Sequence, residues 1–183
     1  RFWITCTENA IYLNSVTIRS KAGGNNPFTV DTYQLVTDVT QLSDSEQIII
    51  GVHQSGVNYV MGYFDETVSR NNIHAIPARY TSDRTQVAPD DRAIYTLHRT
   101  ELNGQTAFYI QDEIRYEEAY LVASGGKTKN TLAAWNYLTD SKTYGNYGYW
   151  DITVAPDGQA TVMNLGNSLG KYLQYNATHS LFG

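Results

Sequence analysis

A short β meander at residues 149–176 is the feature of this sequence that most limits its possible folds. In WDITV at residues 150–154, apolar and polar side chains alternate, as a half-buried strand requires because successive side chains point to opposite faces. PDG at residues 156–158 predicts a turn, since proline presets φ, aspartate bonds back to the backbone and glycine accepts positive φ. ATVMN at residues 160–164 predicts the return strand, and YLQY at residues 172–175 resumes an extended pattern.

Two upstream segments repeat this order of strand, turn, strand and tyrosine-containing strand. The first copy spans residues 33–61 and has a polar turn that ends at residues 43–45. The second copy spans residues 94–123 and has its turn at residues 102–104. Self-similarity of this kind indicates a fold built from repeated supersecondary units.

Each copy carries a tyrosine followed by an aliphatic residue at a similar distance after its turn. From the turn residue to the tyrosine, the distance is 14, 16 and 14 positions in the three copies. A repeated step of this kind would fill equivalent places in the core of a pseudo-symmetric fold. We therefore predict an all-β chain with a β-trefoil-like, pseudo-threefold barrel; the alternative is chance similarity among tyrosine-rich β segments. The three steps are Tyr59-Val60, Tyr120-Leu121 and Tyr172-Leu173.

Residues 1–26 lie outside the threefold pattern and are predicted to form an N-terminal β segment and a linker. Apolar positions alternate within residues 1–20, which indicates two strands around residues 8–10. These strands would either close a preceding sandwich-type module or flank the trefoil. KAGGNNP at residues 21–27 is typical of a linker, so we expect the β-trefoil-like domain to span residues 27–183.

Two longer segments that follow the first and second copies lack a clear alternating pattern. Residues 65–91 are polar and contain two prolines, so we expect a long loop or an edge hairpin around residues 73–80. In residues 124–148 the glycine spacing favours loops, and a helical turn at residues 131–138 is the alternative.

Composition places the chain among secreted-type all-β domains and excludes several partners. The 183 residues include 15 tyrosines and 14 glycines and carry a formal charge of −5, with no basic stripe, which argues against nucleic acid. No run is long and apolar enough to predict insertion into a membrane. Cys6 is the lone cysteine, so we expect no internal disulfide, although a partner lost by truncation is an alternative. The chain begins without methionine and without a signal peptide, which favours a part of a longer polypeptide.

No arrangement of residues predicts catalysis. GGKT at residues 125–128 resembles the end of a phosphate-binding loop, but that loop needs a glycine where Leu121 stands. The four histidines are scattered along the chain, and adjacent acids on a strand point to opposite faces, so each acidic pair supplies one inward carboxylate at most. A glycosidase needs two carboxylates across its substrate. We predict no catalytic residue, no metal and no cofactor, and keep hydrolase activity as a third hypothesis.

The aromatic-rich segment at residues 135–150 is the best functional candidate. Its aromatic side chains alternate with amides and carboxylates, the mixture that holds polar ligands with apolar faces, such as sugars. The alternative is that these aromatics belong to the core or cover one end of the fold. The candidate ligand-binding residues are Trp135, Tyr137, Tyr144, Asn146 and Tyr147. Secondary candidates are Tyr63 and Asp65 in the first copy and Tyr175 and Asn176 in the third.

Four segments in this order carry a resemblance to a known family. QLVTDVTQLSDSEQIIIG, AYLVAS, YWDITVAPDGQATVMN and KYLQYNATHSLFG resemble the C-terminal β-trefoil-like accessory domain of secreted or surface Bacteroidetes proteins, most of them uncharacterised. The family has a glycine in its L-x-x-G-D turn, whereas residues 42–46 read LSDSE, and the family's last strand is longer than the LFG that ends this chain.

This resemblance implies an accessory module outside the cell or on its surface, with no established activity. Trefoils often bind glycans, but the Q-x-W signature of ricin-type sites is missing here. We therefore expect a non-catalytic extracellular binding module whose partner is a glycan; the alternative is a structural or adhesion module that contacts a surface protein. An exposed aromatic beside amides would favour the glycan, and a flat apolar patch would favour the protein partner.

Overall fold

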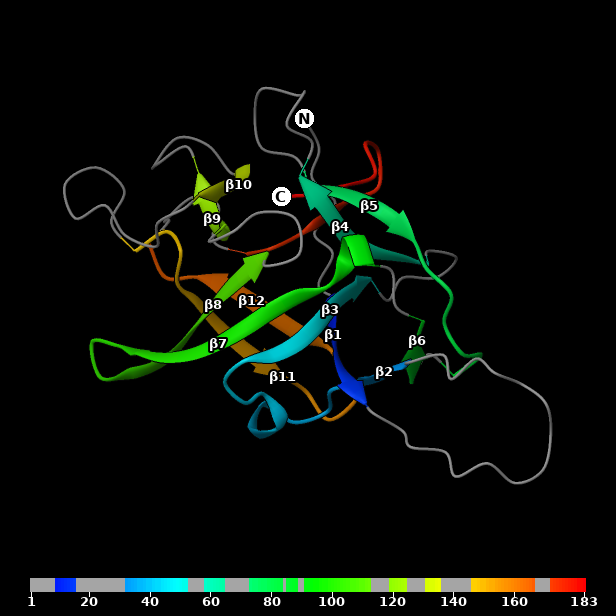
Figure 1. Cartoon of the computed structure of the whole chain (residues 1–183), viewed down its shortest axis with the longest axis horizontal. Coiled ribbons are helices and arrows are strands. Elements are labelled where there is room, and N and C mark those ends of the chain that lie inside the picture. The colour runs from blue at the N-terminus through cyan, green and yellow to red at the C-terminus, as the bar shows by residue number, and fades with distance from the viewer. Residues whose placement is uncertain are drawn as a thin grey trace.

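A computed structural model describes residues 9–15, 32–52, 58–64, 73–83, 85–88, 91–112, 119–124, 131–135, 146–166 and 172–183. Within these ranges the chain is all-β, as predicted: fourteen strands form one curled sheet, and the only helical elements are the 3-10 turns η1 (Val39–Gln41) and η2 (Asp91–Ala93). Figure 1 shows the strands wrapped around a common centre.

Six strands pair in a closed antiparallel cycle that runs β1–β3–β7–β8–β11–β12 and back to β1. We call this cycle the strand ring. Two of its pairs are the tight hairpins β7–β8 and β11–β12, which confirms the predicted turns between them. The bounds are β1 (Asn9–Ser15), β3 (Glu46–Val52), β7 (Tyr95–Leu102), β8 (Gln105–Asp112), β11 (Trp150–Val154) and β12 (Ala160–Asn164).

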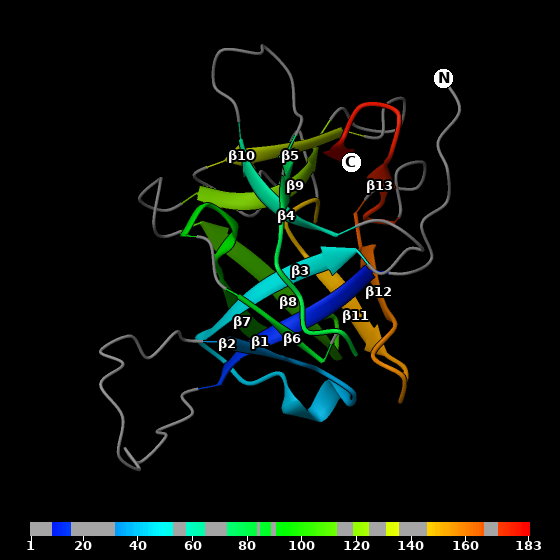
Figure 2. The same cartoon turned by 90° about the vertical axis from the view of Figure 1, so that its right-hand side faces the viewer.

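Three further strand pairs follow the ring strands in sequence, one after β3, one after β8 and one after β12. Both views place them at the same end of the molecule (Figures 1 and 2), and β14 of the third pairs with β5 of the first. Their bounds are β4 (Tyr59–Phe64) with β5 (Ile73–Pro77), β9 (Ala119–Ser124) with β10 (Thr131–Trp135), and β13 (Tyr175–Asn176) with β14 (Leu181–Phe182).

The main core fills the strand ring with side chains from these elements, except β1, whose side chains lie outside the description; among the core residues are Ile48, Leu97, Ile110 and Trp150. In the three predicted tyrosine–aliphatic steps the aliphatic side chains are buried, at no more than 2 % exposure. The tyrosines of these steps remain half-buried or exposed. Leu121 and Leu173 belong to the main core, whereas Val60 belongs to a second buried cluster, so the three aliphatic side chains are buried as expected but do not fill equivalent places. The three tyrosines lie at the surface.

A second cluster lies on the outer side of β3. Ile49 packs there with Tyr33 of β2 (Thr32–Leu35) and Val87 of β6 (Gln86–Val87), whereas its neighbours Ile48 and Ile50 belong to the main core. Since successive side chains of a strand point to opposite faces, β2 and β6 cover the outer face of β3. We call this cluster the covered face.

Several local expectations need correction. Residues 131–135, expected in a loop or helical turn, form β10, because pairing with β9 satisfies their backbone groups and buries Leu132 and Ala133. The strand β1 begins at Asn9, within the turn expected at residues 8–10, because it pairs with β3 from that residue onward. Residues 9–15, expected outside the threefold pattern, thus belong to the strand ring. The expected boundary between residues 26 and 27 lies outside the described residues.

Candidate functional site

Three aromatic side chains form a continuous row on the outer surface of β7, β8 and β9. His98 and Tyr109 are register partners whose rings stack, with centroids 4.6 Å apart and planes 17° apart. Tyr109 meets Tyr120 edge to face, with centroids 5.5 Å apart and planes at 78°. Each of the three is adjacent in sequence to a side chain of the main core, so the rings point outward. All three stay half-buried, and we call them the aromatic row.

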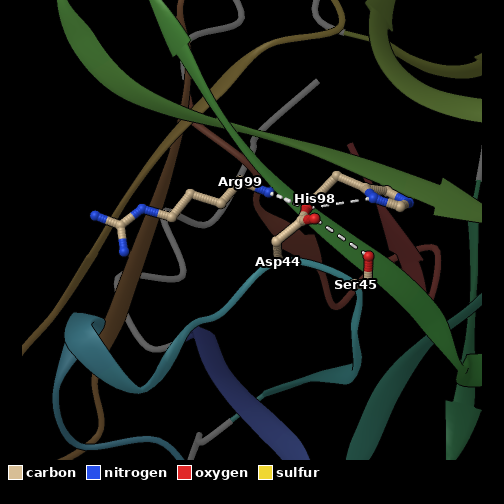
Figure 3. A network of polar contacts seen from close by, with 4 residues as sticks. All are labelled: Asp44, Ser45, His98 and Arg99. Atoms are coloured by element: carbon tan, nitrogen blue, oxygen red, sulfur yellow. Dashed lines mark hydrogen bonds and ion pairs between the residues drawn. The ribbon is translucent and has the colours of Figure 1, made fainter.

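A carboxylate is fixed at one end of the aromatic row. Asp44 lies in the turn before β3, and its Oδ1 accepts the backbone N–H of Arg99 at 3.0 Å and lies 3.5 Å from Nδ1 of His98. Its Oδ2 accepts the hydroxyl of Ser45 at 3.3 Å. Figure 3 shows the side chain of Arg99 directed away from this carboxylate, so only the backbone of that residue contacts it. The Asp44 side chain remains 63 % exposed.

These contacts set the charge along the site. The N–H donated by the Arg99 backbone is the main cause that lowers the pKa of Asp44; desolvation opposes it, and the Ser45 hydroxyl and His98 lower the pKa by smaller amounts. Burial raises the pKa of Tyr109 above its ordinary value, and the nearby Tyr120, Asp44 and Tyr149 raise it further. At neutral pH the site therefore presents an ionised carboxylate beside a neutral phenol that can donate a hydrogen bond.

The turn at residues 146–149 is anchored by Asn164 and lies near the Tyr120 end of the aromatic row. Buried Asn164 donates its Nδ2 to the carbonyl of Tyr147 at 2.8 Å and to that of Tyr149 at 3.3 Å. A Cβ added at Gly166 would lie 2.5 Å from the carbonyl carbon of Asn146, so the two backbones are in close contact. Tyr120 packs against a small cluster that includes Tyr147. The 146–149 turn therefore supports one end of the row.

Some of the predicted ligand-binding residues lie near this row. Trp135 ends β10 and is the register partner of Tyr120, although its side chain is outside what the structure describes. Asn146 is half-buried in the 146–149 turn, whereas Tyr147 is buried at 9 % exposure and packs with Val122 and Ala133. A buried ring supports its neighbours and offers no face for stacking. The remaining two candidates, Tyr137 and Tyr144, lie outside the described residues.

The secondary candidates are separate from the row. Tyr63 belongs to β4, with its side chain outside the description, and Asp65 lies outside the described residues altogether. Tyr175 is buried between Tyr59 and Phe182, with ring centroids 5.8 Å and 5.4 Å away. Asn176 is also buried, and its Oδ1 accepts the backbone N–H of Thr178 at 3.0 Å. The last two side chains thus stabilise the β13–β14 pair.

Reasoning from sequence did not single out the aromatic row or Asp44. Alternation in TLHRT and FYIQD does place His98 and Tyr109 opposite core residues, which is the signal that was available. The pairing register of β7 and β8 places His98 beside Tyr109. Asp44 lies in a distant turn, 55 positions before Arg99, whose backbone N–H it accepts. Neither contact leaves a local pattern.

One catalytic pattern in the sequence lacks its structural setting. GNSLG at residues 166–170 matches the G-x-S-x-G of a nucleophile elbow, which requires a strand, a sharp turn and then a helix. The pattern follows strand β12, residues 167–170 lie outside the described ranges, and residues 172–183 beyond them contain no helix. The described residues 172–183 therefore do not supply the helix that this pattern requires.

Comparison of the chain with protein-family models, with curated proteins and with solved structures finds no match. The resemblance to a Bacteroidetes accessory domain therefore stays a prediction. In the described part of the chain, no cluster of three or more metal-ligating side chains occurs, and no helix has the length and hydropathy to cross a membrane. Among the described large hydrophobic side chains, Tyr172 alone is exposed, at 48 %.

Proposed function

We propose that this protein is a non-catalytic extracellular binding module with a β-trefoil-like fold, and that its ligand is a carbohydrate. The observation that carries the proposal is the outward aromatic row with an exposed, ionised carboxylate fixed at its end. Aromatic rings that offer apolar surface beside a few placed polar groups suit ligands with apolar faces and polar edges, which describes sugar rings.

Two features of the strands and turns support the β-trefoil-like part of this proposal. Each of three units consists of two paired ring strands followed by a strand pair at the same end of the molecule. The turn residues Ser45, Gly104 and Gly158, used to align the three copies, all have positive φ. Such shared backbone geometry is expected of repeated units.

A further repeated feature joins each unit to the one before it. The first residue of β7, Tyr95, donates its hydroxyl to the carbonyl of Gly62 in the preceding strand pair. The first residue of β11, Trp150, donates its Nε1 to the carbonyl of Leu121 at 3.0 Å, again in the preceding strand pair. Two aromatic donors therefore make the same kind of contact in two units.

The alternative partner is a surface protein bound by a structural or adhesion module. A flat, exposed apolar patch would favour that function. Tyr172 is the one exposed large hydrophobic side chain in the described ranges, which favours the carbohydrate over the protein partner. The extracellular address and the membership of a longer polypeptide rest on the sequence alone.

The experiment is a glycan-array screen of the chain followed by calorimetric titration of the best glycan against two variants. Tyr120→Ala removes the ring at the end of the aromatic row away from Asp44, and Tyr172→Ala is the matched control, because Tyr172 holds the corresponding place in the third copy. We expect the first variant to lose binding and the second to keep it. Loss of binding in Tyr172→Ala alone would move the site to the third copy, and the absence of binding to any glycan would overturn the proposal.

A titration of Trp135→Ala connects this site to the aromatic segment identified in the sequence. Because Trp135 is the register partner of Tyr120, we expect weaker binding in this variant. Unchanged affinity would confine the site to the aromatic row and Asp44.

A further inference from the structure

The carboxylate of Asp44 gives the proposed site an electrostatic preference. Besides His98, whose Nδ1 lies 3.5 Å from Oδ1, the carboxylate accepts hydrogen bonds from the backbone N–H of Arg99 and the hydroxyl of Ser45, which are neutral donors. The guanidinium of Arg99 points away from it in Figure 3. The carboxylate is 63 % exposed, and the whole chain carries a formal charge of −5. An incoming ligand therefore meets negative potential at this end of the row.

The aromatic row has the same preference. Phenol rings are electron-rich on their faces and attract cations within about 6 Å of the ring centroid. One face of the Tyr109 ring is stacked on His98, and the ring of Tyr120 is nearly perpendicular to that of Tyr109, at 78°. Electron-rich phenol rings beside a carboxylate make a surface that suits an ammonium group and disfavours carboxylate or sulfate groups.

Building on the proposed function, we propose that the carbohydrate is an amino sugar polymer with free amino groups, bound along the aromatic row with an ammonium directed to Asp44. A sugar chain that lies along the row meets aromatic rings over its length and the carboxylate at one end. An ammonium group then donates a charge-assisted hydrogen bond to Asp44, which a hydroxyl or an acetamide makes less strongly. Like charge disfavours anionic glycans.

The test compares two glycans that differ only at the amino group. Glucosamine oligomers and N-acetylglucosamine oligomers of equal length are titrated into the full chain in mildly acidic buffer at fixed salt, where the amine is protonated. We expect the glucosamine oligomer to bind about tenfold or more tightly than its acetylated counterpart. In Asp44→Asn this difference disappears, while far-UV circular dichroism confirms the fold.

A matched variant controls for general attraction between a polycation and an acidic protein. Asp157→Asn removes an exposed carboxylate that also accepts a backbone N–H, from Gln159 at 3.0 Å, but sits in the β11–β12 turn. This variant should keep the preference for glucosamine oligomers. Equal loss in both variants would reduce the preference to net charge and overturn the inference.

Other outcomes separate this inference from the proposed function. Equal affinity for the two oligomers, or binding of a neutral glycan alone, would overturn the amino-sugar inference and leave carbohydrate binding intact. Binding of a lysine homopolymer as tight as that of the glucosamine oligomer, with the same loss in Asp44→Asn, would show recognition of amines in general and also overturn it. A chain that binds no glycan would contradict both proposals.

Discussion

Two regions on the outer surface of the strand ring differ in how far their side chains are buried. On the covered face, Ile49 of β3 is fully buried beside Tyr33 and Val87, so β2 and β6 extend the core beyond the ring. On β7, β8 and β9, the corresponding outward positions carry the aromatic row, whose rings remain half-buried. The same strand architecture thus produces one buried face, which contributes to stability, and one face with partly exposed aromatic and charged groups. Stability and binding should therefore respond to different substitutions.

The largest expected effect is on the covered face. Ile49→Ala removes a fully buried side chain between the ring and β2, and we expect a loss of about 2–5 kcal/mol in the free energy of unfolding. Urea unfolding followed by fluorescence measures it. Tyr109→Phe is the counterpart on the aromatic row, since it keeps the ring, and should change stability by about 0.5 kcal/mol or less. Equal losses would mean that the row is as much a part of the core as the covered face.

Two turn glycines provide the next test. A Cβ at Gly158 would lie 2.6 Å from the side chain of Leu35 in β2, whereas a Cβ at Gly104 would meet nothing within 4 Å. Both residues have positive φ, which costs an alanine about 1–2 kcal/mol. We expect Gly104→Ala to show that cost alone and Gly158→Ala to add about 1–3 kcal/mol for the clash. Thermal unfolding of both variants compares them, and equal values would contradict the tight packing of the β11–β12 turn on β2.

Asn164 tests how the aromatic row is supported. Asn164→Ala deletes the donor to the carbonyls of Tyr147 and Tyr149, and leaving buried polar groups without this partner should cost about 1–3 kcal/mol. We expect weaker glycan binding as well, because the 146–149 turn loses its anchor. The control is Ile49→Ala, which should lower stability without changing affinity under conditions where it is folded. Unchanged affinity in Asn164→Ala would separate the turn from the site.

The smallest expected effect is a pH dependence at Asp44. Its pKa is lower in the folded chain than its ordinary value of 3.8, so its stabilising contribution is present above that value and is lost as pH falls through the folded pKa. Asp44→Asn should therefore reduce stability near neutral pH and differ less from wild type in acid. Urea unfolding over a pH series measures this difference. The pKa values of Asp38 and Asp83 are also lowered, so some acid sensitivity should remain in the variant. A constant difference at all pH values would contradict the contacts of Asp44.

Local sequence patterns were sufficient where neighbouring residues decide the structure. The turn at Gly158 and the alternation in residues 150–154 predicted the β11–β12 hairpin, and the burial of Leu121 and Leu173 follows from the repeated tyrosine–aliphatic step. Pairing between strands determines the parts of the fold that local patterns did not predict. β1 enters the ring through β3 and β12, and β10 exists because β9 pairs with it, so neither role can be read from its own residues.

The candidate site shows the same division. The sequence predicted an aromatic surface near residues 135–150; in the described part of that segment, Trp135 is the register partner of Tyr120, and buried Tyr147 belongs to the cluster against which Tyr120 packs. Tyr109 and Asp44 were missed because a strand register and a backbone hydrogen bond from Arg99 bring them together. Such contacts depend on the assembled sheet.

The most direct test of the central proposal is an NMR titration of the chain carrying isotope-labelled tyrosine rings with the best glycan from the array. We expect the ring signals of Tyr109 and Tyr120 to shift together and to saturate with the affinity measured by calorimetry, while Tyr33 on the covered face does not respond. Saturable shifts confined to Tyr33, Tyr175 or Tyr172, with the row unchanged, would contradict it.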